Sequence, residues 1–130
     1  MTTPFWCLLI VVALPLLLAF VGDYFRFKQF EKFDNNHPRA QVLGLEGAGA
    51  RSYAAQDNAW EAVAMFVPAV LVAHLTGVAA ETAALAAMIF VGARVAHAIL
   101  YIANIAALRS LSFVVGLGCC LWLFYLSAQA

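Results

Sequence analysis

Residues 51–61 read RSYAAQDNAWE, and a long apolar run follows them directly. Asn58 and Glu61 are three residues apart, so on a helix they lie on one face. Arg51 lies two turns earlier on nearly the same face. A carboxylate at the edge of an apolar segment is costly unless it faces protein or a water-filled cavity. This stretch therefore predicts a membrane helix with a functional polar face at one end.

The composition is that of a membrane protein. Hydrophobic residues make up 65% of the 130 residues, and charged residues only 11%. Soluble domains usually carry about 25% charged residues. The formal net charge is zero, so nothing in the composition favours nucleic-acid binding. The length predicts a single domain, residues 1–130.

Four apolar segments are candidates for crossing a bilayer, at about residues 5–22, 58–75, 83–104 and 111–126. The helix that contains the second segment is expected to start near Ser52. The only sizeable polar stretch, residues 23–50, separates the first two segments, and short turns are expected at residues 76–82 and 105–108. The sequence thus predicts an all-α integral membrane protein, a bundle of four transmembrane helices.

The basic residues predict an orientation. Those around the first connection are Arg26, Lys28, Lys32, Arg39 and Arg51, and those flanking the third are Arg94 and Arg109. The second connection and both termini have none. Because Lys and Arg concentrate on the cytoplasmic side, the first and third connections are expected there and both termini on the other side. Both polar faces would then open to the cytoplasm.

Several polar side chains can act together on these faces. Arg94, His97 and Tyr101 are spaced to share one face of the third helix, and the same spacing adds Asn104. A carboxylate such as Glu61 beside guanidinium groups suits a zwitterion with an amine and more than one carboxylate. Arg109, at a predicted helix start, could stabilise a thiolate, because a cation and a helix N-terminus both lower a thiol pKa.

Other interpretations of these residues stay open. Intramembrane Arg, Glu and Asn also join helices or subunits without any ligand, and Glu61 paired with Arg94 would explain both residues. A small transporter or proton channel is a third class, since Glu61 and His97 could relay protons. The polar groups gather toward one membrane side, which counts against transport. The three cysteines lie in apolar runs whose spacing predicts no metal site.

Two segments resemble the MAPEG family, the membrane-associated proteins in eicosanoid and glutathione metabolism. Residues 51–61 are similar to the family's R-x-x-x-A-x-x-N-x-x-E signature in helix two. Residues 92–101, GARVAHAILY, followed by Leu108-Arg109-Ser110, resemble the R-V-A-H-x-x-x-Y and R-S segments of the microsomal prostaglandin E synthase branch, beside the microsomal glutathione transferases. The resemblance covers essentially the whole chain.

The resemblance implies a function. It implies a homotrimer that acts as a glutathione transferase, with peroxidase activity as an option, on a lipophilic electrophile or lipid from the bilayer. The compactness of the chain separately suggests a bacterial inner membrane protein. Glutathione, the co-substrate, would bind at the cytoplasmic side of subunit interfaces. The residues implied for binding are Arg26, Arg51, Gln56, Asn58, Glu61, Arg94, His97 and Tyr101. Arg109 and Ser110 are implied for catalysis, Arg109 as the residue that stabilises the thiolate.

Three positions depart from the family pattern. Ala54 stands where glutathione-binding branches often have a second Arg, Asp57 where some members have a basic residue, and Phe113 where the prostaglandin branch has a Tyr. Each lost charged hydrogen bond to a ligand would cost about 1.5–3 kcal/mol. The missing cations at Ala54 and Asp57 favour an alternative function, a non-catalytic lipid-binding or scaffold protein on the same fold.

Overall fold

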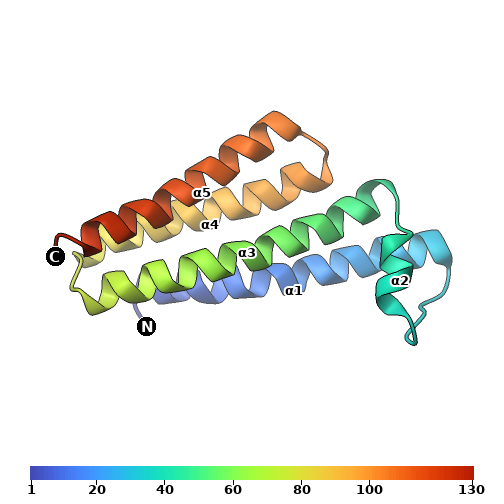
Figure 1. The fold of residues 1–130 in the computed structure, drawn as a ribbon, viewed down its shortest axis with the longest axis horizontal. Helices are drawn as coiled ribbons and strands as arrows, with labels where there is room; N and C mark the ends of the chain where they lie inside the picture. The colour runs from blue at the N-terminus through green and yellow to red at the C-terminus, as the bar shows by residue number, and fades with distance from the viewer.

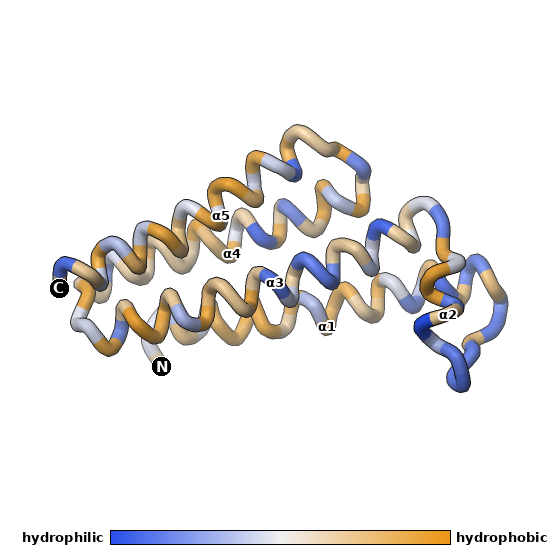
Figure 2. The backbone as a smooth tube through the Cα atoms, in the orientation of Figure 1, coloured by the Kyte–Doolittle hydropathy of each residue, from blue (hydrophilic) through white to orange (hydrophobic).

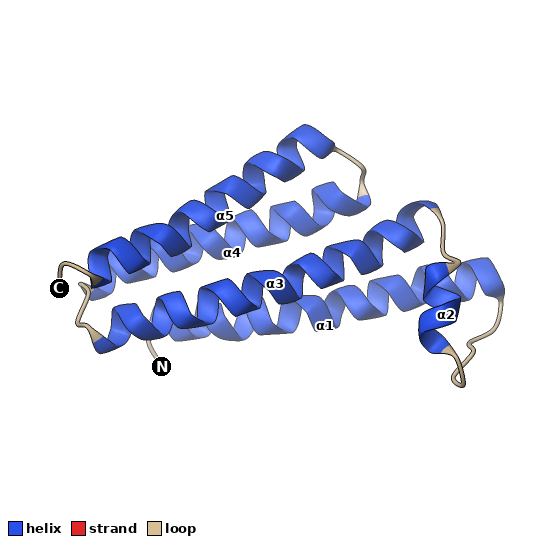
Figure 3. Ribbon diagram, in the orientation of Figure 1, coloured by secondary structure: helices blue, strands red, loops and turns tan.

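A computed structural model describes residues 1–130 as five helices. They are α1 (Thr3–Phe30), α2 (Pro38–Leu43), α3 (Gly47–Leu75), α4 (Ala80–Ile102) and α5 (Ala106–Ser127). All except α2 are long and apolar enough to cross a membrane. Both termini lie at one end of the bundle and α2 lies at the other (Figure 1; Figure 3). The prediction of an all-α fold with four candidate membrane spans is confirmed.

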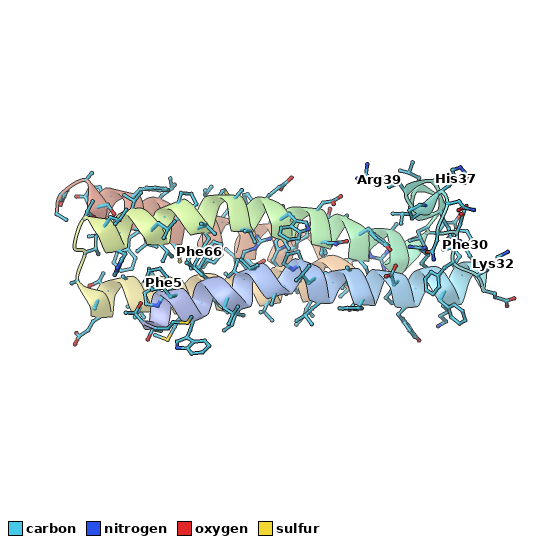
Figure 4. The ribbon with its side chains drawn as sticks, turned by 90° about the horizontal axis from the view of Figure 1, so that it is seen from below. Phe5, Phe30, Lys32, His37, Arg39 and Phe66 are labelled. Carbon is cyan, nitrogen blue, oxygen red and sulfur yellow. The ribbon has the colours of Figure 1, made fainter.

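The bundle packs through small residues. α1 packs along α3, α4 packs along α5, and α3 also contacts both α4 and α5. Alanines of α3 and α4 fill the centre, and Ala69 and Ala86 are fully buried. Small side chains of this kind let membrane helices approach closely. The rings of Phe66 and Phe90 stack between α3 and α4 with centroids 4.0 Å apart, and Phe66 points into the bundle (Figure 4).

The helices extend beyond the apolar segments. α1 continues past Gly22 to Phe30, where Glu31 adopts a left-handed conformation with φ of 56°. α3 begins at Gly47, not near Ser52 as expected. The physical reason is that hydropathy marks where lipid contact ends, whereas backbone hydrogen bonding continues wherever a neighbouring helix supports it.

The connection between α4 and α5 is also shorter than expected. α5 begins at Ala106, so a turn over residues 105–108 is wrong, and Arg109 lies in the first turn of the helix. α4 ends at Ile102, and Asn104 has a φ of 62°. Asn104 is therefore not on the helical face that carries Arg94, because the chain has left the helix before reaching it.

The short helix α2 is held against α1 by a polar network. The side-chain amide of Gln41 accepts a hydrogen bond from Arg26 Nε at 2.6 Å and donates one to the carbonyl of Lys32 at 2.7 Å. The carboxylate of Asp34 accepts backbone N–H groups of His37 and Asn36, both at 2.9 Å. These donors, His37 first, hold the pKa of Asp34 below its usual value. Figure 4 shows the side chains that gather around α2.

Replacing Gly22 by Ala is expected to destabilise the protein by about 1–3 kcal/mol, the usual cost of overpacking. A Cβ at Gly22 would lie 2.8 Å from the ring of Tyr53. The ring cannot swing away freely, because the Tyr53 hydroxyl donates a 2.8 Å hydrogen bond to Asp23. The midpoint of thermal unfolding in detergent measures the effect. Gly118→Ala is the control, since a Cβ there meets nothing within 4 Å; equal midpoints for the two variants would contradict the prediction.

Candidate functional site

The predicted polar faces meet at the end of the bundle that carries α2. The first half of α3, the second half of α4 and the start of α5 all lie at this end (Figure 1). Figure 2 shows hydrophilic positions on α3 and α4 in this half, while the opposite half is largely hydrophobic. The antiparallel order of the helices produces this arrangement, since α3 enters the bundle where α4 leaves it.

A hydrogen-bonded network in the site runs from Arg94 through Asn58 to Glu61. Arg94 is only 2% exposed, and its Nη2 donates to the backbone oxygen of Asn58 at 3.2 Å and to Asn58 Oδ1. Asn58 Nδ2 in turn donates to Glu61 Oε2 at 2.9 Å. Because an amide has one donor end and one acceptor end, Arg94 determines which way Asn58 faces.

Glu61 does not form an ion pair with Arg94. The ion pairs of the chain are Arg26 with Asp23 and His37 with Asp34, and Glu61 is exposed on the surface of α3. The hypothesis that Glu61 pairs directly with Arg94 inside one bundle is therefore wrong. Asn58 lies between them, and the Glu61 carboxylate faces outward.

α4 and α5 contribute a second group of polar residues. His97 is 4% exposed, its Nδ1 lies 3.5 Å from Arg94 Nη2, and its ring meets that of Tyr101 edge to face with centroids 5.7 Å apart. The Arg109 guanidinium lies 4.5 Å from the centroid of the Tyr101 ring. Arg109 is thus held at the N-terminus of α5, where the helix dipole adds to its positive charge. Ser110 beside it is exposed.

Two of the predicted binding cations have partners within the chain. Arg51 Nε donates to the carbonyl oxygen of Ile102 at 2.8 Å, so Arg51 binds one of the carbonyls that α4 leaves free at its end. Arg26 is 7% exposed and forms an ion pair with Asp23 at 3.1 Å. The structure places neither residue in direct contact with the hydrogen-bonded network that links Arg94, Asn58 and Glu61.

A cleft beside α2 brings other predicted residues together. We call it the α2 cleft; it has a volume of about 600 Å³. Its lining residues are Arg26, Pro38, Arg39, Val42, Leu43, Tyr53, Gln56, Asp57 and Trp60. It thus brings together two of the predicted binding residues, Arg26 and Gln56. Glu61 follows Asp57 by one turn on the same face of α3. Sequence analysis did not assign Arg39, Tyr53 or Trp60 to a site; Pro38, in a position typical of a helix start, was the available signal for α2.

Comparison with known proteins identifies a family for the whole chain. A model of the MAPEG family matches residues 3–129, nearly the whole chain. The chain belongs to the MAPEG family. No curated protein matches it. Membership in MAPEG is consistent with a function in glutathione or eicosanoid metabolism and with an integral membrane protein in a lipid bilayer.

In this MAPEG protein the site is open on the side of α3. The Asp57 and Glu61 side chains are both exposed and have no ion-pair partner within the protein. Glu61 stands directly before the apolar part of a helix long enough to span a membrane, where an uncompensated carboxylate facing lipid is costly. The exposed face of α3 therefore presents two carboxylates next to the apolar segment.

Proposed function

We propose that this MAPEG protein is a membrane-bound glutathione transferase that works as a homotrimer, with its thiol site at the cytoplasmic side of the subunit interfaces. The observation that supports this most directly is the pair of hydrogen bonds from Arg94 to Asn58 and from Asn58 to Glu61, which orients the exposed carboxylate of Glu61. The ammonium group of a γ-glutamyl thiol pairs with that carboxylate. A neighbouring subunit closes over the face of α3 and removes it from lipid.

Each residue of the proposed site has a role. Glu61 and Asn58 bind the γ-glutamyl end, and Gln56, Arg26 and Arg51 lie toward the mouth of the site. His97 and Tyr101 line the pocket, with Arg94 behind them. Arg109 stabilises the thiolate through its charge and its place at the start of α5, and the Ser110 hydroxyl donates a hydrogen bond to the sulfur.

The proposed reaction follows from the thiolate. Its sulfur attacks an electrophilic carbon of a lipophilic substrate that enters from the bilayer, so that a carbon–sulfur bond forms. A leaving group departs with the electron pair of its bond, or an attacked double bond takes a proton from water. In the peroxidase version, two glutathione molecules reduce a lipid hydroperoxide to an alcohol and water and are themselves oxidised to the disulfide. We place the protein in a bacterial inner membrane, with both termini on the non-cytoplasmic side.

Millimolar glutathione is expected to raise the thermal midpoint of the detergent-solubilised wild type but not of Glu61→Ala. A ligand at about 100 times its Kd stabilises a protein by about 2.7 kcal/mol, enough for a visible shift. Glu81→Ala is the matched control, because Glu81 is exposed in the first turn of α4, at the far end of the bundle. A similar rise in wild type and Glu61→Ala would remove Glu61 from the site, and no rise in the wild type would count against glutathione as the ligand.

A second function, a non-catalytic lipid-binding or scaffold protein, rests on a separate observation. Arg26 and Arg51 both bind groups of their own chain, and Ala54 and Asp57 add no cation. A subunit with few free cations suits a dicarboxylate thiol less well. This alternative predicts that added phospholipid raises the thermal midpoint whereas glutathione does not.

A further inference from the structure

Arg51 caps the end of α4 from a different helix. Its Nε donates a 2.8 Å hydrogen bond to the carbonyl oxygen of Ile102, the last residue of α4. The three preceding carbonyls accept the backbone N–H groups of the turn that follows: Ile99 from Ala103, Leu100 from Ile105 and Tyr101 from Asn104. The turn thus uses all of its N–H groups on other carbonyls, and the last carbonyls of a helix need donors from outside it. Arg51 therefore completes the C-terminal cap of α4.

The turn after Ile102 has little other support. Residues 103–105 are all exposed, and Asn104 lies in the left-handed region with φ of 62°. The hydrogen bond from Arg51 ties the start of this turn to α3. Without that bond the turn would depend on its local backbone hydrogen bonds, and exposed segments of this kind open readily.

Both residues of the Arg109 contact flank this turn. Tyr101 precedes it in the last turn of α4, and Arg109 follows it in the first turn of α5, where its backbone N–H donates to Ile105 at 3.1 Å. The guanidinium of Arg109 lies 4.5 Å from the centroid of the Tyr101 ring. A shift of the turn therefore moves the start of α5 relative to α4 and displaces Arg109 from the ring. A displacement of about 1 Å at a reacting centre can cost about 10²-fold in rate.

Resting on the proposed function, we propose that Arg51 is a positioning residue of the thiol reaction. Its hydrogen bond to Ile102 fixes the turn between α4 and α5 and thereby aims Arg109 at the thiolate. Arg51 acts on the rate through Arg109 and does not itself bind glutathione. The two ends of the stretch RSYAAQDNAWE then have separate roles, since Asn58 and Glu61 hold the ligand whereas Arg51 holds the helix start that carries the thiolate-stabilising cation.

Two variants separate the hydrogen bond from the charge. In Arg51→Gln the amide nitrogen is as many bonds from the backbone as Nε is in arginine, so the donor is kept and the charge is lost. In Arg51→Met a methyl group takes that place, so both are lost. Conjugation of glutathione to chlorodinitrobenzene by the full-length, detergent-solubilised protein measures the effect. Arg51→Met is expected to lower kcat by about 10- to 100-fold, to leave the KM for glutathione within about twofold of wild type, and to shift the pH–rate profile upward as Arg109→Ala does.

The hydrogen bond alone should preserve the rate, so Arg51→Gln is expected to keep kcat within about threefold of wild type. In the Arg109→Ala background Arg51→Met should lower kcat little further, because the group that it positions is gone. Lys32→Met, which removes an exposed cation near α2, is the control and should behave as wild type. Hydrogen exchange needs no activity: the amides of Asn104 and Ile105 should exchange faster in Arg51→Met but not in Arg51→Gln, while residues 76–79 stay unchanged.

The possible results separate this proposal from the proposed function. If both variants raise the KM for glutathione and leave kcat unchanged, Arg51 binds the ligand and the positioning role is overturned, but the thiol site stands. If Arg51→Gln loses as much kcat as Arg51→Met, or if the turn exchanges equally in Arg51→Met and wild type, the role given to the hydrogen bond is overturned. If the wild type neither binds nor conjugates glutathione, the proposed function is overturned, and faster exchange in Arg51→Met would leave Arg51 with the capping role alone.

Discussion

Replacing Arg109 by Ala is expected to lower kcat for thiol conjugation by about 10²–10³, the usual cost of removing one group that stabilises a developing anion. The affinity for the thiol should change little, because the proposed anchors of the ligand are Glu61 and Asn58 on α3. Arg109 is held in place by the ring of Tyr101, 4.5 Å from its guanidinium, and by its position in the first turn of α5. Its removal deletes the only cation of that turn.

The pH dependence distinguishes this role from a structural one. Arg109 favours the charged thiolate, so without it the pKa of the bound thiol rises and the pH–rate profile of Arg109→Ala shifts to higher pH. The ultraviolet absorbance of the bound thiolate should fall at neutral pH in parallel. Arg109→Lys is expected to recover part of the rate, and Lys32→Ala, an exposed cation near α2, should behave as wild type. Turnover of Arg109→Ala within about threefold of wild type would remove the proposed role.

The residues that could be predicted are those whose position follows from local periodicity. Asn58 and Glu61 share a face because α3 is a helix, and Arg94, His97 and Tyr101 share one because α4 is. The antiparallel order of four spans then brings both faces to one end of the bundle. None of these steps requires knowledge of a side-chain contact between distant residues, so sequence patterns were sufficient.

The partners of Arg26 and Arg51 could not be predicted for the opposite reason. Arg51 donates to the carbonyl of Ile102, a residue 51 positions away, and a free carbonyl at a helix end has no side-chain signature. Arg26 bonds Gln41 from α2, a helix of six residues that is too short for periodicity to reveal. Both cations were predicted to bind a ligand because nothing local in the sequence shows which distant group each one contacts.

The predicted end of α4 was wrong for a related reason. Asn104 was expected to extend the polar face of α4, but its left-handed conformation, with φ of 62°, lies beyond the helix end at Ile102. Asn tolerates this conformation better than most residues, so its identity fits a helix end as well as a site. The spacing alone did not separate the two possibilities, whereas the backbone does.

Arg94→Leu is expected to weaken thiol binding about tenfold, although Arg94 is placed behind the ligand. Without the guanidinium, Asn58 loses the donor to its Oδ1, and the amide is free to flip and turn its oxygen toward Glu61. The carboxylate then loses its orienting N–H. The free energy of unfolding should also fall, by about 1–3 kcal/mol, because the oxygens of Asn58 lose their donor. Part of this loss of stability is offset. Arg94 Nε is already buried without a hydrogen-bond partner in the wild type, and a leucine side chain suits that environment better.

A double-mutant cycle on the thiol Kd tests whether Arg94 acts through Asn58. If it does, Asn58→Ala and Arg94→Leu should be strongly non-additive, with a coupling energy in the range of about 0.5–3 kcal/mol found for residues in one network. Effects that add within about 0.5 kcal/mol would mean that the two residues act independently. Gly92→Ala is the control on the same helix, since a Cβ there meets nothing within 4 Å. Arg94→Lys separates charge from geometry: it keeps the cation, but a lysine cannot reproduce the planar guanidinium, so the orientation of Asn58 and the affinity should recover only in part.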